Sequence, residues 1–92
     1  MFTWLNKQGV KSDKGFVVQS IGRFVIKYSE NIGDIDVTVE DGFKDGKHFV
    51  YIYDKEFYQW KNGRKISEEK KTQILSNFID ALEFMGIGVK VQ

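Results

Sequence analysis

The spacing of apolar residues changes once along this chain, near residue 57, and that change constrains the fold more than any other feature. Before it, β-branched and aromatic residues alternate with polar ones, as in Ile35, Val37 and Val39, which is the pattern of a strand with one buried face. After it, apolar residues recur at spacings of three and four between Ile74 and Met85, as on an amphipathic helix. The chain therefore predicts a set of strands followed by one helix.

Turn and capping residues set the expected bounds of these elements. Glycine, aspartate and asparagine separate four expected strands, at 16–20, 23–30, 35–40 and 48–54, with 41–46 as the last connecting loop. Ser67 has the hydroxyl expected of a helix N-cap, and Gly86 suits the left-handed position after the last turn. The first residues, 2–8, are expected to form a helical turn or a frayed arm.

Together these elements predict an α+β protein in two layers, with a four- to five-stranded, mostly antiparallel sheet packed by one long C-terminal helix. The strands are expected within about 16–57, the helix at about 67–85 and a short terminal strand at 87–91. A chain of 92 residues and 10.7 kDa supplies one hydrophobic core, so residues 1–92 are expected to form a single domain.

Catalytic chemistry finds little support in the sequence. There is no cysteine and one histidine, His48, so the ligands of structural zinc and a thiol nucleophile are missing. The glycines form no phosphate-binding loop, and Asp34 and Asp36 lie two apart on one wet strand face, where solvated carboxylates are common. No apolar run is long enough to span a membrane. We predict no enzyme activity, no catalytic residue, no cofactor, no metal and no membrane contact.

The charges are segregated into blocks. Residues 30–45 hold six carboxylates against Lys44 alone, whereas residues 55–71 hold six cations against three carboxylates. The acidic block and the many aromatic residues either are solvated loops and core rings, or share a protein-binding face. The segment 55–71, with Tyr58 and Trp60, suggests an alternative as a small nucleic-acid-binding regulatory protein. A pI near 7.9 is low for such a basic binder, so we rank that alternative second.

One stretch resembles a known family. It comprises Phe57-Tyr58-Gln-Trp60, Asn62-Gly63, Ile66-Ser67 and the helical run from Lys71 to Gly86, with Ile74-Leu75-Ser-Asn77 and Ala81-Leu82 inside it. Over residues 49–90 this is similar to bacterial immunity proteins that are encoded beside polymorphic or contact-dependent growth inhibition toxins. The resemblance implies a cytoplasmic α+β protein without catalysis that binds and neutralises one cognate toxin domain, here expected to be a basic nuclease.

The expected contact combines carboxylates that replace substrate phosphates with aromatic anchors. The residues predicted to bind the toxin are Asp34, Asp36, Glu40, Asp41, Asp45, Phe43, Tyr51 and Tyr53. We assign Trp60 to packing at the junction between the last strand and the helix, and Asn77 to a half-buried hydrogen bond. The protein itself is expected to be a monomer.

Overall fold

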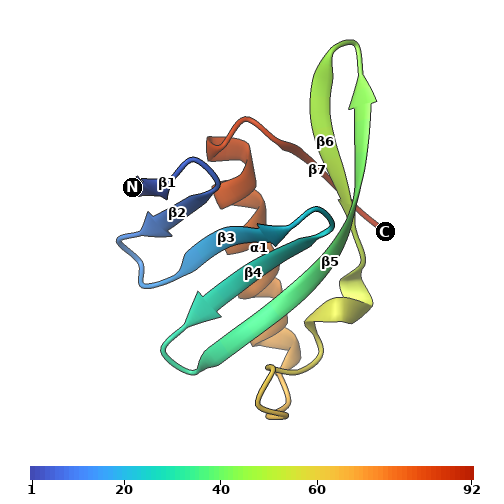
Figure 1. Ribbon diagram of the computed structural model, residues 1–92. Coiled ribbons are helices and arrows are strands. Elements are labelled where there is room, and N and C mark those ends of the chain that lie inside the picture. Colours follow the sequence, from blue (N-terminus) through green and yellow to red (C-terminus); the bar gives the residue numbers. More distant parts are fainter.

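A computed structural model describes residues 1–92, whose strands form one seven-stranded sheet in the spatial order β1 to β7 (Figure 1). The strands are β1 Phe2–Asn6, β2 Gly9–Ser12, β3 Val17–Gly22, β4 Val25–Glu30, β5 Gly33–Lys44, β6 Lys47–Ile52 and β7 Gly88–Val91. A short 3-10 helix, Asp54–Phe57, and the α-helix α1, Glu68–Phe84, lie between β6 and β7. The first six strands pair antiparallel with their neighbours, and β7 pairs parallel with β6.

The expected sheet of four to five strands packed by a long helix is wrong. The sheet has seven strands, is mixed, and curls around the one α-helix as a half-barrel (Figure 1). The N-terminal residues form β1 and β2 rather than a helical turn or an arm, because Phe2 and Trp4 alternate with polar or outward residues. The Asp41-Gly42 pair, expected in a loop, lies inside β5, which runs for 12 residues. The broad α+β class remains, but the strand count and arrangement do not.

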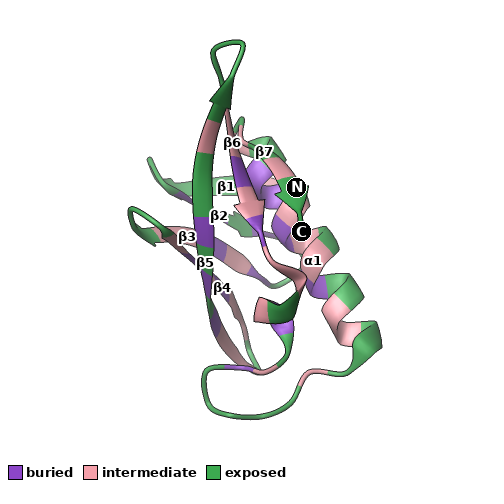
Figure 2. Cartoon of the chain, turned by 90° about the vertical axis from the view of Figure 1, so that its right-hand side faces the viewer, coloured by how far each residue is buried: buried purple, intermediate pink, exposed green.

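The core lies between the concave side of the sheet and α1 (Figures 1 and 2). Alternate residues of β5 point inward, so Ile35, Val37 and Val39 are buried while their neighbours face water, which confirms the alternation expected for this segment. On the helix, the buried face consists of Ile74, Phe78, Ala81 and Leu82.

Both ends of α1 are defined as expected. The Ser67 hydroxyl accepts a hydrogen bond from the backbone N–H of Lys70 at 3.2 Å, which satisfies one of the free amides of the first turn. Gly86 takes φ +83°, and the following Ile87 N–H donates to the carbonyl of Leu82 at 2.9 Å. This left-handed residue turns the chain toward β7 without the steric strain that a side chain would add.

Trp60 is buried in the loop between the 3-10 helix and α1, as expected. Its ring stacks on Tyr28 with centroids 6.5 Å apart, and Tyr28 in turn stacks on Phe16 at 5.6 Å. The loop is tied to the sheet by the backbone N–H of Lys61, which donates to the carbonyl of Asp34 at 2.7 Å. Trp60 therefore closes one end of the core.

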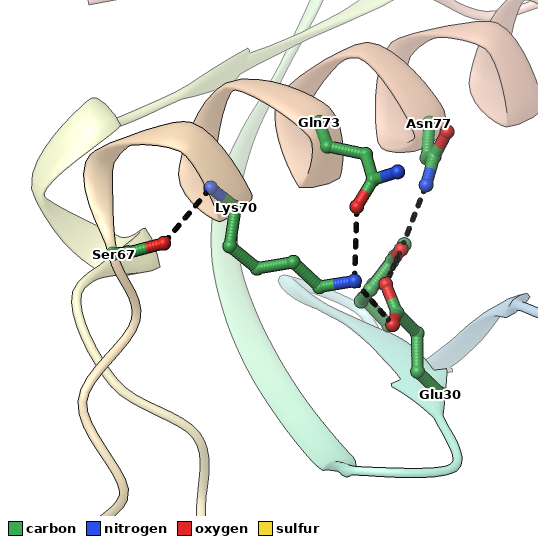
Figure 3. A network of polar contacts seen from close by, with 6 residues as sticks. Glu30, Ser67, Lys70, Gln73 and Asn77 are labelled. Carbon is green, nitrogen blue, oxygen red and sulfur yellow. Dashed lines mark hydrogen bonds and ion pairs between the residues drawn. The ribbon is translucent and has the colours of Figure 1, made fainter.

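A polar network joins β4 to the N-terminal half of α1 (Figure 3). The Tyr28 hydroxyl donates to the Glu30 carboxylate, which also accepts from the Lys70 ammonium at 2.7 Å. Lys70 donates as well to Gln73 Oε1 at 2.9 Å, and Asn77 Nδ2 donates to the Tyr28 oxygen at 3.0 Å. Asn77 is thus a half-buried hydrogen-bonding residue, which confirms its structural assignment.

Alkaline pH should destabilise the fold through Tyr28. Burial, and then the hydrogen bond to Glu30, raise the pKa of Tyr28 above its usual value near 10. A raised folded-state pKa gives stability that is complete below pH about 10 and is lost as pH rises toward the folded value. We expect urea titrations between pH 9 and 11 to show that the free energy of unfolding falls more steeply with pH in wild type than in Tyr28→Phe. The control Tyr58→Phe, which changes an exposed ring, should show the same dependence of the free energy of unfolding on pH as wild type. The same dependence in Tyr28→Phe would contradict this account.

Candidate protein-binding surface

The second half of β5 and the whole of β6 form a hairpin whose turn extends beyond α1 (Figure 1). Its strands pair from Val39 opposite Ile52 to Lys44 opposite Lys47, and its outer end is exposed (Figure 2). Asp45 with φ 54° and Gly46 with φ 77° form the tight turn, as an Asp-Gly pair favours in a two-residue hairpin loop. We refer to residues 39–52 as the projecting hairpin.

The inner side of the projecting hairpin carries a preorganised aromatic residue. Phe43 is 73% exposed, yet its ring stacks on His48 with centroids 5.0 Å apart and planes inclined by 19°. His48 is fixed in turn by Asp41, whose Oδ1 lies 2.9 Å from the imidazole Nε2. A large exposed ring held in one orientation loses little side-chain entropy when a partner covers it.

The outer side of the same hairpin presents a second cluster. The Tyr53 hydroxyl donates to Glu40 Oε1 at 2.6 Å, and this bond raises the pKa of Tyr53. The rings of Phe49 and Tyr51 meet edge to face at 5.2 Å, with the Lys90 ammonium 4.7 Å from the Phe49 ring centroid. These residues form a half-exposed polar and aromatic surface.

Half of the six carboxylates of the acidic block, namely Glu30, Asp34 and Asp36, lie beside a lysine of the same chain. Asp34 lies 3.4 Å from the Lys27 ammonium, and Asp36 lies 2.9 Å from that of Lys61. The hydrogen bond to Asp36 raises the pKa of Lys61. Because these exposed pairs cancel much of the local charge, the block presents a weaker negative field than its sequence indicates.

The eight residues predicted for toxin binding do not share one face. Asp34 and Asp36 lie on the outer face of the half of β5 that pairs with β4, away from the projecting hairpin. The other six divide within or beside the hairpin, with Glu40, Tyr51 and Tyr53 outward, Asp41 and Phe43 inward, and Asp45 at the turn. The sequence places all eight near one another in the chain, but alternation along a strand separates them in space.

The basic segment 55–71 brings only part of the patch considered for nucleic acid to the surface. Trp60 is buried, and Lys61, Lys70 and Lys71 each form an ion pair with a carboxylate of this chain. Tyr58 is the one ring of this segment that is mainly exposed, at 61%. Arg64 and Lys65 are exposed and form no ion pair, so nucleic-acid binding through this segment stays a prediction.

Other functional arrangements are not formed. No three histidine, cysteine, aspartate or glutamate side chains come together to hold a metal ion. Ser20 lines the same cavity of about 120 Å³ as Asp41 and His48, but its hydroxyl donates to the carbonyl of Gly22 at 3.3 Å rather than to the imidazole. None of the helices combines the length and apolar character needed to cross a bilayer.

Sequence reasoning missed two features of the surface. The sequence assigns no role to His48 once metal binding is set aside, whereas in the structure its ring stacks on the exposed Phe43 ring. The exposed ring of Trp4 contacts Phe84 of α1 in a tilted arrangement with centroids 5.7 Å apart, so β1 and the last turn of α1 share one apolar patch. The alternation of Phe2 and Trp4 is the signal that indicates β1, and a strand there would have placed both rings on one face.

This geometry is the basis for assigning a function. Comparisons of the chain with protein-family models, with curated proteins and with solved structures find no match.

Proposed function

We propose that this chain is a cytoplasmic immunity protein that binds and neutralises a cognate bacterial toxin domain, and that the projecting hairpin is its main contact. The class of partner comes from the resemblance over residues 49–90. The observation that supports a protein contact is the hairpin itself, which extends past the helix and carries Phe43 with 73% of its surface exposed. Exposed aromatic anchors at a projecting position are typical centres of binding energy.

The two sides of the hairpin suit different parts of such a contact. Phe43 offers an apolar ring for a pocket of the partner, and Asp41 and His48 hold that ring in place. Glu40, Tyr51 and Tyr53 offer hydroxyl and carboxylate groups for a polar rim on the other side. A partner that covers the hairpin would therefore meet the apolar anchor on the inner side and the polar groups on the outer side.

Charge contributes less to this contact than the sequence suggests. Asp36 and Asp34 already lie beside lysines of the same chain, so they add little net field toward a basic partner. We therefore assign the binding strength mainly to the ring and the hairpin shape. Any electrostatic acceleration of binding should come from Asp45, which forms no ion pair in this structure, and from Glu40.

The proposal expects a toxin gene beside the gene of this chain, and the test uses the C-terminal toxin domain that this neighbour would encode. Its expression should stop bacterial growth, and expression of this chain should restore growth. Purified Phe43→Ala should bind that domain about 10- to 100-fold more weakly than wild type, because a central anchor is lost. Tyr58→Ala, which removes a ring that is 61% exposed and lies away from the hairpin, should bind like wild type.

The outcomes separate the two parts of the proposal. Absence of growth rescue by wild type would remove the immunity function. Rescue and full affinity in Phe43→Ala would keep that function and exclude the hairpin as the contact. Asp36→Asn combined with Glu40→Gln should lower the association rate constant by a smaller factor than the factor by which Phe43→Ala raises the dissociation rate constant. Stopped-flow measurements at two salt concentrations would determine both factors.

A further inference from the structure

The strand β1 forms one edge of the sheet, and its edge is open over Phe2–Trp4. Many natural edges carry a lysine or a bulge that discourages pairing with another chain. The opposite edge strand β7 has Lys90 at its centre, whereas Phe2–Leu5 contains no charged side chain. A register irregularity between Trp4 and Asn6 ends the regular part of β1.

The hydrogen-bond pattern shows which groups of β1 are unused. The carbonyl of Met1 accepts from the backbone N–H of Asp13 at 3.1 Å, so Met1 directs its backbone groups toward β2. In an antiparallel pair this direction alternates, so Thr3 also bonds to β2 while Phe2 and Trp4 direct their N–H and C=O groups outward. Two donors and two acceptors therefore face away from the sheet.

An apolar patch lies beside these groups. The Phe84 ring contacts both Phe2, at 5.2 Å between centroids, and Trp4, at 5.7 Å. Trp4 and Phe84 are each about half exposed. We call Phe2, Trp4 and Phe84 the β1 patch. One strand placed beside β1 could therefore cover these rings and pair with the unused backbone groups.

We infer that the β1 edge pairs with the β1 edge of a second copy of this chain, in an antiparallel dimer with its two-fold axis through Thr3. In that register Phe2 of each copy lies opposite Trp4 of the other. The outward N–H and C=O groups of these residues then form four backbone hydrogen bonds. Directly opposite residues of a sheet share a face, so the two β1 patches meet on the same side. No like charges face each other, because the N-terminal ammonium is already bound to Asp13 at 2.9 Å.

The area of this contact sets its strength. Burying the exposed halves of Trp4 and Phe84 removes about 200 Å² of ring surface per copy, because a whole aromatic side chain presents about 150 to 250 Å². Stable interfaces bury about 800 Å² per partner. The dimer should therefore be weak and reversible. The projecting hairpin stays free in this arrangement, so the inference does not depend on the proposed function.

Sedimentation equilibrium of the full chain between 20 µM and 1 mM tests the inference. We expect the mean mass to rise from 10.7 kDa toward twice that value. Proton–nitrogen spectra over the same range should show concentration-dependent shifts at the Phe2 and Trp4 amides. A mass that stays at the monomer value at 1 mM would overturn the inference.

Substitutions locate the contact. Trp4→Thr removes the ring but keeps a residue that favours strands, and it should weaken association at least about 10-fold. Trp4→Pro also removes the outward N–H, which has no partner within the chain, so it should abolish association while the monomer stays folded. The control is Phe24→Thr, since Phe24 and Trp4 are both 48% exposed, and it should associate like wild type. Equal loss in Phe24→Thr, or dimerisation by Trp4→Pro, would assign the association to another surface.

Discussion

Trp60→Ala should lower the free energy of unfolding by about 3 to 5 kcal/mol, because it removes a buried indole and leaves a cavity that the loop cannot fill. The Trp60 ring packs on Tyr28, and its backbone N–H and C=O bond to Arg64 and Gly63 within the same tight loop. These backbone bonds hold the loop in place, so collapse into the cavity is restricted. Urea denaturation followed by far-ultraviolet circular dichroism measures the loss.

The matched control for Trp60 is Tyr58, two residues earlier in the same loop. Its ring is 61% exposed, and the backbone carbonyl that accepts from Ile66 is kept in Tyr58→Ala. This variant should lose less than about 1 kcal/mol, as is usual for an exposed position. If Trp60→Ala melts like Tyr58→Ala, the indole does not close the core.

Glu30→Ala should cost about 2 to 3 kcal/mol, although it removes a single carboxylate. The Glu30 side chain is 13% exposed and accepts from Lys70, which is 27% exposed, and from the Tyr28 hydroxyl. Without it, an ammonium and a hydroxyl between β4 and α1 lose their acceptor in a site that water enters poorly. Thermal or urea unfolding at neutral pH measures the change.

Two further variants separate this desolvation effect from a general effect of removing charge. Glu68→Ala removes a carboxylate that is 93% exposed, 4.0 Å from Lys71, and should change stability by under about 1 kcal/mol. Glu30→Leu combined with Lys70→Met replaces the whole pair by apolar groups and should lose less than Glu30→Ala alone. A double variant as unstable as the sum of its single variants would show that the pair is not coupled.

The sequence predicts the parts of this fold that depend on local periodicity and capping. The alternation of β5 and the caps at Ser67 and Gly86 depend on neighbouring residues alone, so these predictions are confirmed. The expected number of strands was wrong because β1 and β2 are short, and because their backbone pairing depends on tertiary contacts. The parallel pairing of β7 with β6 likewise depends on where α1 returns the chain.

The candidate site shows the same boundary between local and long-range information. The sequence identifies the acidic block, but it does not show that Lys61 reaches Asp36 from 25 residues away in the chain. It also treats 41–42 as a loop, since Asp and Gly are frequent in turns, although the Phe49 ring covers Gly42 across the two strands. A Cβ at Gly42 would lie 2.5 Å from that ring, so glycine here makes room for an aromatic residue.

One feature of β5 bears on how force passes through the molecule. The strand runs from Gly33 to Lys44 without a joint, and at Val39 it exchanges one neighbour, β4, for the other, β6. A load applied to the ring of Phe43 is therefore carried along continuous backbone to Val37 in the core. The hairpin is therefore a rigid extension of the sheet, and a force applied to it acts directly on the hydrophobic core.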